Sequence, residues 1–141
     1  MKNLWKKLDE HLFFVKYLFL FSAVLLQSCE LPNPEQIRKN QYLPEKDLIP
    51  DISLGKSKFE VYCLRCHGRA AQGSNKGPPL VDEIYLPDHH SDQAFRWAVR
   101  DGVSQHHWRF GNMPPIKDVT PEDVAHIIVY VRQLQRQADL F

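Results

Sequence analysis

The sequence lacks the charge pattern of a nucleic-acid-binding protein. Its 18 lysines and arginines are balanced by 17 aspartates and glutamates, which leaves a formal net charge of +1. Neither a basic stripe nor an interleaving of basic with aromatic residues runs along the chain, although proteins that bind the phosphate backbone usually carry such a footprint. We therefore expect no nucleic acid among the partners of this protein.

Several other features are also absent. The chain has no internal repeat and no low-complexity tract, and its 141 residues suit a single domain. No pair of catalytic carboxylates and no nucleophile beside a base stands out, so we interpret the chain as something other than an enzyme on its own. With 43% hydrophobic residues the core is small, and small cores often need a metal or a cofactor for stability.

The N-terminus carries the pattern of an export signal. A lysine-bearing start is followed by an apolar stretch over residues 17–26 and then by small and polar residues, which is the order found in secretory signals. The stretch is shorter than the about 20 apolar residues of a membrane-spanning helix, and extending it backward would bury Lys16 in the bilayer. We predict that residues 1–28 are a signal peptide or, alternatively, an uncleaved anchor. Either version places the rest of the chain outside the cytoplasm.

An unpaired cysteine, Cys29, stands directly after this signal. An odd cysteine in an exported protein suggests a special use. Leu26-Gln27-Ser28-Cys29 resembles the lipobox of bacterial lipoproteins, although Gln27 is bulkier and more polar than the residue usual there. The resemblance implies that Cys29 is lipidated and becomes the mature N-terminus, so that acyl chains hold the protein at the membrane. The alternative is an incidental cysteine that is removed with the signal.

Residues 29–50 are polar and interrupted by prolines. They show no apolar period, and their prolines prevent a long uninterrupted helix. We predict that this segment is an extended tether between the membrane anchor and a folded domain of residues 51–141.

The motif that carries chemistry is Cys63-Leu64-Arg65-Cys66-His67. It is the C-x-x-C-H sequence to which c-type haem is attached: two thiols form thioethers with the porphyrin, and the adjacent histidine offers its imidazole to the iron. A thioredoxin-type C-x-x-C would need a surrounding βαβ pattern, and a zinc site would need a second ligand pair. The sequence shows neither. We therefore predict one covalently bound haem c, held by Cys63, Cys66 and His67.

Around this motif, residues 51–136 resemble the class I cytochromes c. Gly55 and Phe59 precede the motif at the spacing of that family's N-terminal helix, for which Ser53 is the expected N-cap. The resemblance implies an all-α, cytochrome c-like fold, in which a small helical shell surrounds one haem.

The turn that follows the motif adds to this resemblance. Residues 77–80 read Gly-Pro-Pro-Leu, which is similar to the family's Gly-Pro-x-Leu turn. The resemblance implies that the carbonyl of Pro78 accepts the Nδ1 proton of His67. Such a bond to a metal-binding histidine fixes the imidazole tautomer and raises its basicity.

Methionine is scarce, and apart from the initiator the chain contains Met113 alone. It lies in a Gly-Asn-Met-Pro-Pro sequence that matches the family's Met-Pro-Pro signature, which implies that its thioether is the sixth ligand of the haem iron. A methionine ligand raises the reduction potential. Trp108 and Arg109 lie near the expected haem edge, where they either bond the propionates or simply pack. The rival ligands are two histidine pairs, which we expect to be solvated loop residues: His89, His90, His106 and His107.

A helix is expected over residues 91–102. Ser91 is its N-cap and Gly102 its exit. Three apolar residues share one face at helical spacing, which indicates packing against a core: Phe95, Ala98 and Val99.

A last helix is expected to begin after Thr120, with Pro121 at its first position and acidic residues in its first turn. Its apolar stripe consists of Val124, Ile127, Ile128, Val131 and Leu134. The family resemblance implies that this helix crosses the one that carries Gly55 and Phe59, with Tyr130 at the contact.

An iron with two protein ligands has no open position, which favours electron transfer over substrate binding. We predict a one-electron carrier on the periplasmic face of a bacterial membrane. Its donor would be a quinol-oxidising complex or a dehydrogenase, and its acceptor a terminal oxidase. Two alternatives stay open: a haem subunit of a multisubunit oxidoreductase, and a haem-based sensor in which a gas molecule displaces Met113.

Overall fold

The computed structural model describes residue 13, residues 15–18 and residues 31–141. The chain divides into two compact units, Met1–Asn33 and Pro34–Phe141. In the first unit, the rings of Phe13 and Tyr17 lie 4.6 Å apart between centroids. Cys29 and most of the predicted signal peptide fall outside the described residues, so both assignments stay predictions. Within the described part of the chain, no helix combines the length and the apolar character needed to cross a bilayer.

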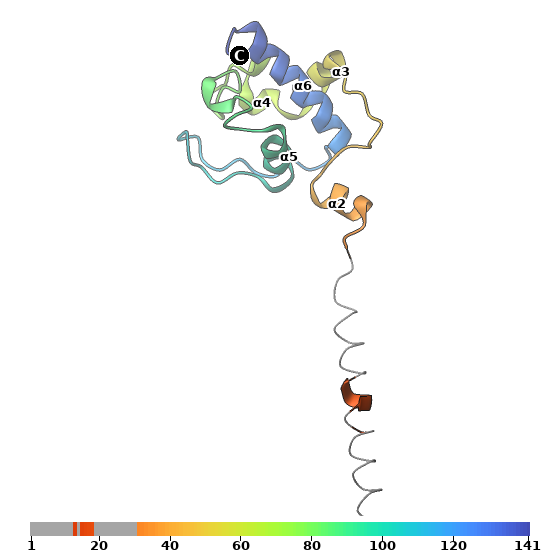
Figure 1. The fold of residues 1–141 in the computed structure, drawn as a ribbon. Coiled ribbons are helices and arrows are strands. Elements are labelled where there is room, and N and C mark those ends of the chain that lie inside the picture. The colour runs from red at the N-terminus through yellow and green to blue at the C-terminus, as the bar shows by residue number, and fades with distance from the viewer. Residues whose placement is uncertain (1–12, 14, 19–30) are drawn as a thin grey trace, which may run out of the picture. The chain divides into compact units, whose positions relative to one another are not determined.

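The second unit is built from helices joined by loops, as Figure 1 shows. Its helices are α2 (Pro34–Asn40), α3 (Ile52–Tyr62), α4 (Leu64–His67), α5 (Asp92–Asp101) and α6 (Pro121–Gln137), with two short 3-10 helices, η1 (Arg69–Ala71) and η2 (Glu83–Tyr85). The described residues form no strand, and one isolated antiparallel bridge pairs Val103 with Met113. The all-α expectation is therefore confirmed.

Helix α3 begins at a different cap from the one expected. The carboxylate of Asp51 accepts a hydrogen bond from the N–H of Leu54 at 2.7 Å, which is the bond of an N-cap. The prediction that Ser53 caps this helix is wrong, because the helix starts at Ile52 and Ser53 already lies in its first turn. The N–H of Asp51 also donates to Nδ1 of His126 at 2.8 Å, which ties the start of α3 to α6.

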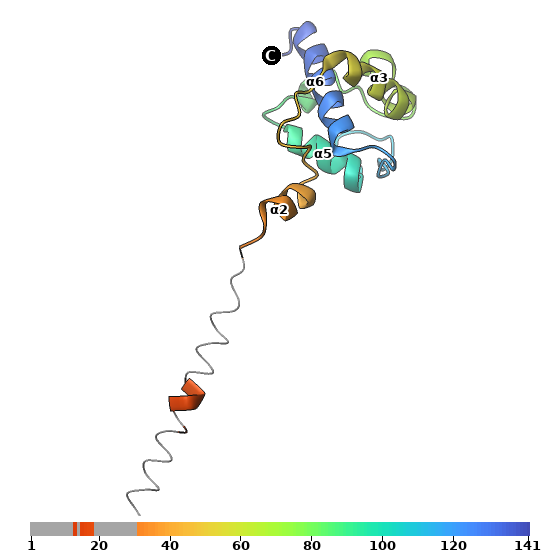
Figure 2. The same cartoon turned by 90° about the vertical axis from the view of Figure 1, so that its right-hand side faces the viewer.

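Helices α3 and α6 cross in close contact, as the family resemblance implied (Figure 2). A Cβ atom at Gly55 would lie only 2.0 Å from the carbonyl oxygen of His126, so a residue without a side chain is needed there. One turn later, the fully buried ring of Phe59 packs edge-on against Tyr130, with ring centroids 5.6 Å apart. The predicted contact of Gly55, Phe59 and Tyr130 is confirmed.

The ends of α5 and α6 match their sequence signals. Ser91 Oγ accepts from the N–H of Ala94, and Gly102 ends α5 with a φ of +78°. Thr120 Oγ1 accepts from the N–H of Asp123 at 3.1 Å, and α6 starts directly afterwards. These caps are the reason why both helices could be placed from the sequence to within a residue or so.

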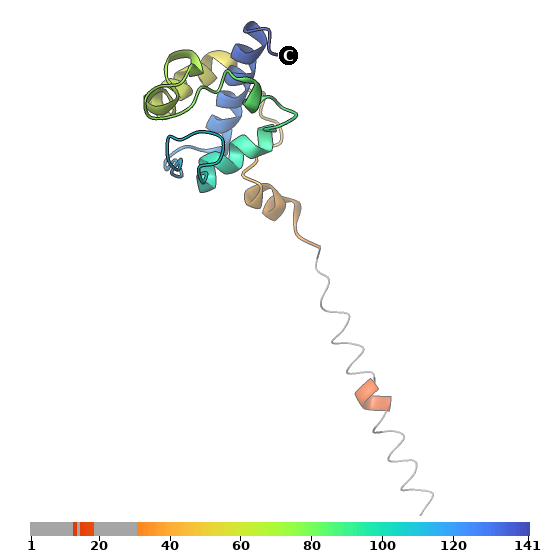
Figure 3. The ribbon, with the colours of Figure 1, turned by 90° about the vertical axis from the view of Figure 1, so that its left-hand side faces the viewer.

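Helix α6 supplies half of the buried apolar residues of the core cluster. It contacts α3, α5 and η1, and its course can be followed in Figure 3. The apolar stripe predicted for it is buried except for Leu134, which is partly buried. The buried apolar residues of the cluster are Phe59, Ala71, Leu80, Val99, Val119, Val124, Ile127, Ile128, Tyr130 and Val131.

Residues 34–50 belong to this compact unit and not to an extended tether. Pro34 occupies the first position of α2, where a backbone N–H would have no helical partner in any case. The Tyr42 hydroxyl donates to the carbonyl of Val119, and the Gln93 amide donates to the carbonyl of Gln41 at 2.6 Å. The expectation of a tether is thus corrected for residues 34–50, because their polar groups find partners on α5 and on the loop before α6.

Candidate functional site

The C-x-x-C-H motif forms a helical turn directly after α3. The N–H of Cys63 donates to the carbonyl of Phe59 at 2.8 Å and the N–H of His67 donates to that of Cys63 at 2.9 Å, so the motif continues the rigid helix that packs on α6. Cys66 is exposed, Cys63 is partly buried and His67 is 9% exposed. The imidazole is therefore the most enclosed group of the motif.

A tight loop after α4 brings Pro78 to this imidazole. Gly68 turns the chain with a φ of +74°, and a Cβ atom there would lie 1.9 Å from the carbonyl oxygen of Gly73. The N–H of Gly73 donates to the carbonyl of His67 at 2.7 Å, and Ser74 Oγ donates to the carbonyl of Cys66 at 2.6 Å. The loop thus folds back onto the motif and leads directly into the Gly-Pro-Pro-Leu turn.

The expected contact between His67 and Pro78 is present. Nδ1 of His67 lies 2.9 Å from the carbonyl oxygen of Pro78. A carbonyl only accepts hydrogen bonds, so Nδ1 carries the proton and Nε2 keeps its lone pair. Burial lowers the pKa of His67, and the bond to Pro78 offsets part of that decrease. The imidazole is therefore neutral at neutral pH, which is the form that binds a metal.

The cysteines do not have the properties of a redox-active dithiol. Burial, with a smaller effect of Cys66, raises the pKa of the Cys63 thiol to about 12. A thioredoxin-type nucleophile needs a lowered thiol pKa, because the thiolate is the reactive species. The structure thus supports the sequence-based rejection of a thioredoxin-like role for this C-x-x-C.

Met113 belongs to the long loop between α5 and α6, and Figure 1 shows the course of this loop. Its N–H and carbonyl pair with those of Val103, each at 2.9 Å. Inside the loop, the N–H of Gln105 donates to Asn112 Oδ1 at 2.9 Å, and the N–H of Gly111 donates to Gln105 Oε1 at 2.7 Å. These bonds across the loop hold Met113 in place, with its side chain partly buried in the wall of a cavity.

The predicted haem residues surround this cavity, whose volume is about 500 Å³. Its wall includes Cys63, Cys66, His67, Pro78 and Met113. The volume lies within the about 300–1,000 Å³ usual for cofactor sites. Aromatic and aliphatic side chains complete the wall, among them Tyr62, Leu80, Tyr85, Phe95, Val99, Trp108, Ile116 and Ile127. Thiols for attachment, a buried neutral imidazole, a thioether and an apolar wall together fit a covalently bound haem.

Trp108 lines the cavity, whereas Arg109 is exposed and is not part of its wall. The buried indole N–H of Trp108 finds no acceptor of normal hydrogen-bond geometry among the described residues. Burial raises the pKa of Tyr85, and the nearby Trp108 indole offsets part of that increase. Of the two residues expected at the haem edge, Trp108 is therefore the one positioned to donate to a polar group in the cavity.

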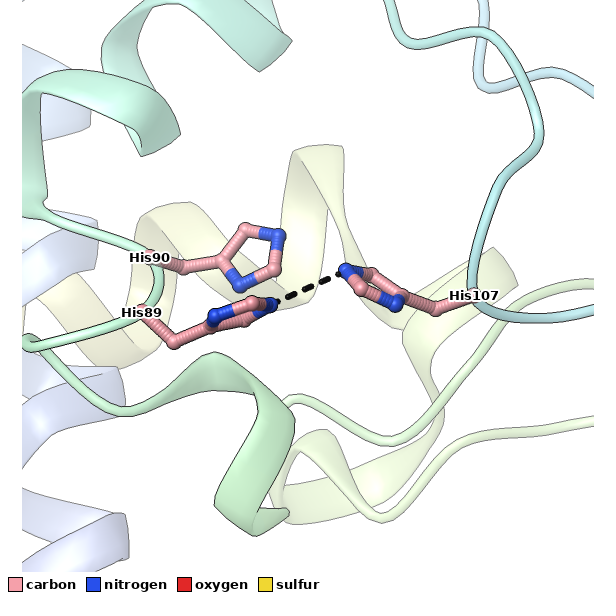
Figure 4. Close-up of side chains that lie close together, drawn as sticks. All are labelled: His89, His90 and His107. Atoms are coloured by element: carbon pink, nitrogen blue, oxygen red, sulfur yellow. Dashed lines mark hydrogen bonds between the residues drawn. The ribbon is translucent and has the colours of Figure 1, made fainter.

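Of the two histidine pairs, which we expected to be solvated loop residues, His89, His106 and His107 are exposed and His90 is partly buried. All four nevertheless line the cavity and come together. The ring centroid of His107 lies 5.1 Å from that of His89 and 5.2 Å from that of His90 (Figure 4). Partial burial, together with the charges of neighbouring histidines, lowers the pKa of His90 and of His107. No sequence signal predicts this gathering, because the two pairs lie in different loops with no periodic spacing.

Sequence reasoning also missed the buried polar group that fixes the segment before α5. Arg132, which is 6% exposed, donates to the carbonyls of Tyr85 and His90 at 2.6 Å each, and to the Asp92 carboxylate at 2.9 Å. Gln135, which is fully buried, also donates to the carbonyl of Tyr85, at 3.1 Å. In the sequence both side chains resemble ordinary polar positions of an amphipathic helix.

Comparison with known proteins gives relatives of one kind. The family model described as cytochrome c oxidase, cbb3-type, subunit III, matches residues 50–131. Two curated relatives are described as cbb3-type cytochrome c oxidase subunit FixP. The one from Sinorhizobium medicae is 30% identical over 113 residues, which cover 77% of this chain and 37% of the relative. The one from Rhizobium meliloti is 32% identical over 87 residues, which cover 59% and 30%.

The chain therefore spans only about a third of the length of these relatives, 37% of one and 30% of the other. Among solved structures, it is similar to cytochrome CL from the marine methylotrophic bacterium Methylophaga aminisulfidivorans. That match has a TM-score of 0.50 at 25% sequence identity, and it covers 82% of this chain and 77% of the other.

Proposed function

Because the chain belongs to the family of cbb3-type cytochrome c oxidase subunit III, whose domain is a cytochrome c, we propose that it transfers single electrons through one haem c. The family binds haem c covalently, so the predicted cofactor is confirmed at that level. For this chain, the proposed attachment residues are Cys63 and Cys66, and the proposed axial ligands are His67 and Met113.

One observation carries this proposal: the buried His67 imidazole donates its Nδ1–H to the carbonyl of Pro78 at 2.9 Å. Within the described part of the chain, the imidazole makes no other hydrogen bond. Its Nε2 is left free for a ligand, and His67 and Met113 line the same cavity. A nitrogen and a thioether sulfur in one apolar cavity are the two ligand types of a low-spin electron-transfer haem.

When bound, the haem supplies the one-electron redox chemistry. The chain's own residues orient the axial ligands and exclude water. Pro78 orients the imidazole and raises its basicity. The base of the Met113 loop, closed by the two bonds to Val103, presents the thioether in a fixed position. The apolar wall excludes water, which favours the less charged state of a centre inside it.

We further propose that the protein works on the periplasmic face of a bacterial membrane, anchored by a lipid on Cys29 or by an uncleaved N-terminal segment. Support comes from the signal-like sequence of residues 1–28 and from relatives that are subunits of a respiratory oxidase. Substitution of Cys29 by serine tests the anchor. A lipoprotein loses membrane attachment in the Cys29→Ser variant, whereas an uncleaved anchor keeps the variant in the membrane fraction.

The second candidate function is that of a haem subunit inside an oxidase complex, and the two FixP relatives favour it. In either role the donor is a quinol-oxidising complex or a periplasmic dehydrogenase and the acceptor a terminal oxidase. Mild solubilisation and affinity purification of the tagged chain separate the two roles. A subunit brings a haem-containing oxidase with it at fixed stoichiometry, whereas a free carrier elutes alone and reduces the oxidase with a rate that depends on concentration.

The proposal of an electron-transfer role is tested against a gas-sensing role with carbon monoxide. With both axial positions filled by protein, the ferrous form binds carbon monoxide slowly or not at all at neutral pH. Prompt and complete binding by the wild-type protein would contradict electron transfer as its main role.

A further inference from the structure

Three histidines meet in the wall of the haem cavity, and the function described above uses none of them. One ring nitrogen from each of His89, His90 and His107 lies within 4.8 Å of the others. Figure 4 shows His89 and His90 leaving one loop side by side, with His107 pointing toward them from the opposite loop. His89 and His107 are exposed, and His90 is partly buried. The cluster is therefore open to solvent on one side.

The distance between the nearest nitrogens suits a shared metal ion. Nε2 of His89 and Nε2 of His107 share a hydrogen bond of 3.2 Å (Figure 4), so one of the two carries a proton that must move to its own Nδ1 before both nitrogens can bind an ion. Two imidazoles that bind one tetrahedral ion at about 2.0–2.1 Å place their nitrogens about 3.3 Å apart. The observed separation therefore needs little rearrangement of these two rings, and the third nitrogen, from His90, already lies within 4.8 Å of them.

The donor atom of His90 is also in the protonation state that binds a metal. Nδ1 of His90 lies 2.6 Å from the carbonyl oxygen of Ile84, so Nδ1 carries the proton and Nε2 keeps its lone pair. A bond from the far ring nitrogen to a backbone carbonyl is the usual outer support of a metal-binding histidine.

Helix α6 holds the loop that carries His89 and His90 through the side chain of Arg132. Arg132 bonds the carbonyl of His90 at one end of the loop and that of Tyr85 at the other, each at 2.6 Å. The guanidinium is itself paired with Asp92 at 2.9 Å. The loop that carries two of the three histidines is thus already ordered, which lowers the entropy cost of binding an ion.

We propose that His89, His90 and His107 bind one divalent transition-metal ion of the zinc or copper class, at a site separate from the haem iron. Imidazole is a preferred ligand of Zn²⁺ and Cu²⁺, and three histidines leave a fourth position for water. Because the three residues come from two loops of the cavity wall, the ion joins the loop of Met113 to the loop after η2.

The test is a titration of the purified full-length holoprotein with ZnCl₂ and, separately, with CuSO₄, followed by calorimetry. One ion should bind per haem. His107→Gln should weaken Zn²⁺ binding by more than about tenfold, since loss even of an outer support of a metal ligand costs about 10–100-fold. Because the ring of His107 is exposed, we expect this variant to fold, and haem content and far-ultraviolet circular dichroism check that it does.

The matched control is His106→Gln. His106 is the chain neighbour of His107 and equally exposed, yet it is outside the group of converging nitrogens. We expect its Zn²⁺ affinity to stay within about threefold of the wild-type value, a change smaller than the tenfold of a lost ligand or support. The proposal is overturned if the wild-type protein binds no stoichiometric ion, if His107→Gln binds as tightly as wild type, or if His106→Gln is weakened as much as His107→Gln.

Two spectroscopic readouts separate this site from the haem iron. Cu²⁺ in the site should give an electron paramagnetic resonance signal with nitrogen hyperfine structure, and that signal should be lost in His107→Gln. Zn²⁺ should leave the axial-ligand bands of the haem unchanged. A Zn²⁺-induced loss of the axial-ligand bands would show that the ion displaces a haem ligand and would overturn a separate site.

Discussion

At the scale of single residues, the helix crossing depends on the missing side chain at position 55. A Cβ atom there would lie 2.0 Å from the backbone oxygen of His126 and 3.0 Å from Cβ of Tyr130. Neither atom belongs to the flexible end of a side chain, so the two helices would have to move apart. The haem-attachment turn follows α3 directly, and it would move with that helix.

We therefore predict that Gly55→Ala lowers the free energy of unfolding by at least about 2 kcal/mol, in the range of overpacking costs. Urea unfolding followed by circular dichroism measures this. The control is Lys56→Ala, the next residue of the same helix, whose side chain is exposed. Equal stabilities of the two variants would contradict the close crossing of α3 and α6.

A second single-residue prediction concerns Arg132. Arg132→Met should lower the free energy of unfolding by about 3 kcal/mol, because it leaves the partly buried carbonyl of His90 without its donor and that of Tyr85 with only the longer bond from Gln135. Arg136→Met removes a guanidinium one turn later on α6, at an exposed position, and should change stability by less than about 0.5 kcal/mol. Thermal unfolding of both variants checks the difference, and a ranking in the opposite order would refute the role of Arg132.

The third residue-scale prediction is a dependence on pH. The pKa of His90 is lowered from its ordinary 6.5, first by burial and then by the neighbouring histidines and Arg132. The unfolded chain therefore takes up this proton first as pH falls. The contribution of His90 to stability is complete above pH 6.5 and is lost as pH falls below that value.

Accordingly, the free energy of unfolding should fall less between about pH 7 and about pH 5 in His90→Gln than in the wild-type protein. Urea titrations at the two pH values measure the difference. Identical pH dependence in both proteins would show that the His90 environment in solution does not disfavour its charged form.

At the scale of elements, the helices were predictable where a cap and an apolar stripe coincide. Ser91 and Thr120 each cap the helix that follows them, as expected. The start of α3 was harder, since Asp51 and Ser53 are both good N-cap residues and lie within one turn of each other. Asp51 is the N-cap because its N–H also donates to His126 on α6. This is a tertiary contact, which the local sequence does not indicate.

Residues 34–50 show the same limit for a whole segment. Four prolines between residues 32 and 50 indicated an extended chain, and proline does prevent a long helix. The partners of the segment, however, are Val119 and Gln93, which lie about 50 to 80 residues further along the chain. No local sequence pattern predicts contacts between residues so far apart in the chain.

This assignment yields the fourth prediction, which concerns truncation. A holoprotein that begins at Pro34 should unfold at nearly the same temperature as one that begins at Leu31. A holoprotein that begins at Asp51 should unfold at a clearly lower temperature, because it loses the bonds of Tyr42 and Gln41 with the domain. Differential scanning calorimetry makes the comparison. Equal unfolding temperatures for all three would restore the tether interpretation.

At the scale of the whole molecule, the sequence motifs and the cavity identify the same residues. The sequence placed the attachment cysteines, His67, Pro78 and Met113 in one site on the strength of three short motifs, and the structure brings all five to one cavity of about 500 Å³. Their roles as ligands and attachment points stay predictions. What the sequence could not supply is the rest of the wall, above all the histidines of two separate loops, because a cavity is made by packing and not by spacing.

The central claim is that His67 and Met113 are the two axial ligands of one haem. The most direct test is the optical spectrum of the purified oxidised protein, compared with that of Met113→Ala and of His107→Gln. Wild type and His107→Gln should both show the weak far-red band that marks a bond from ferric iron to a methionine sulfur, and Met113→Ala should lack it. Absence of the band from the wild-type protein, or its survival in Met113→Ala, would contradict this ligand set.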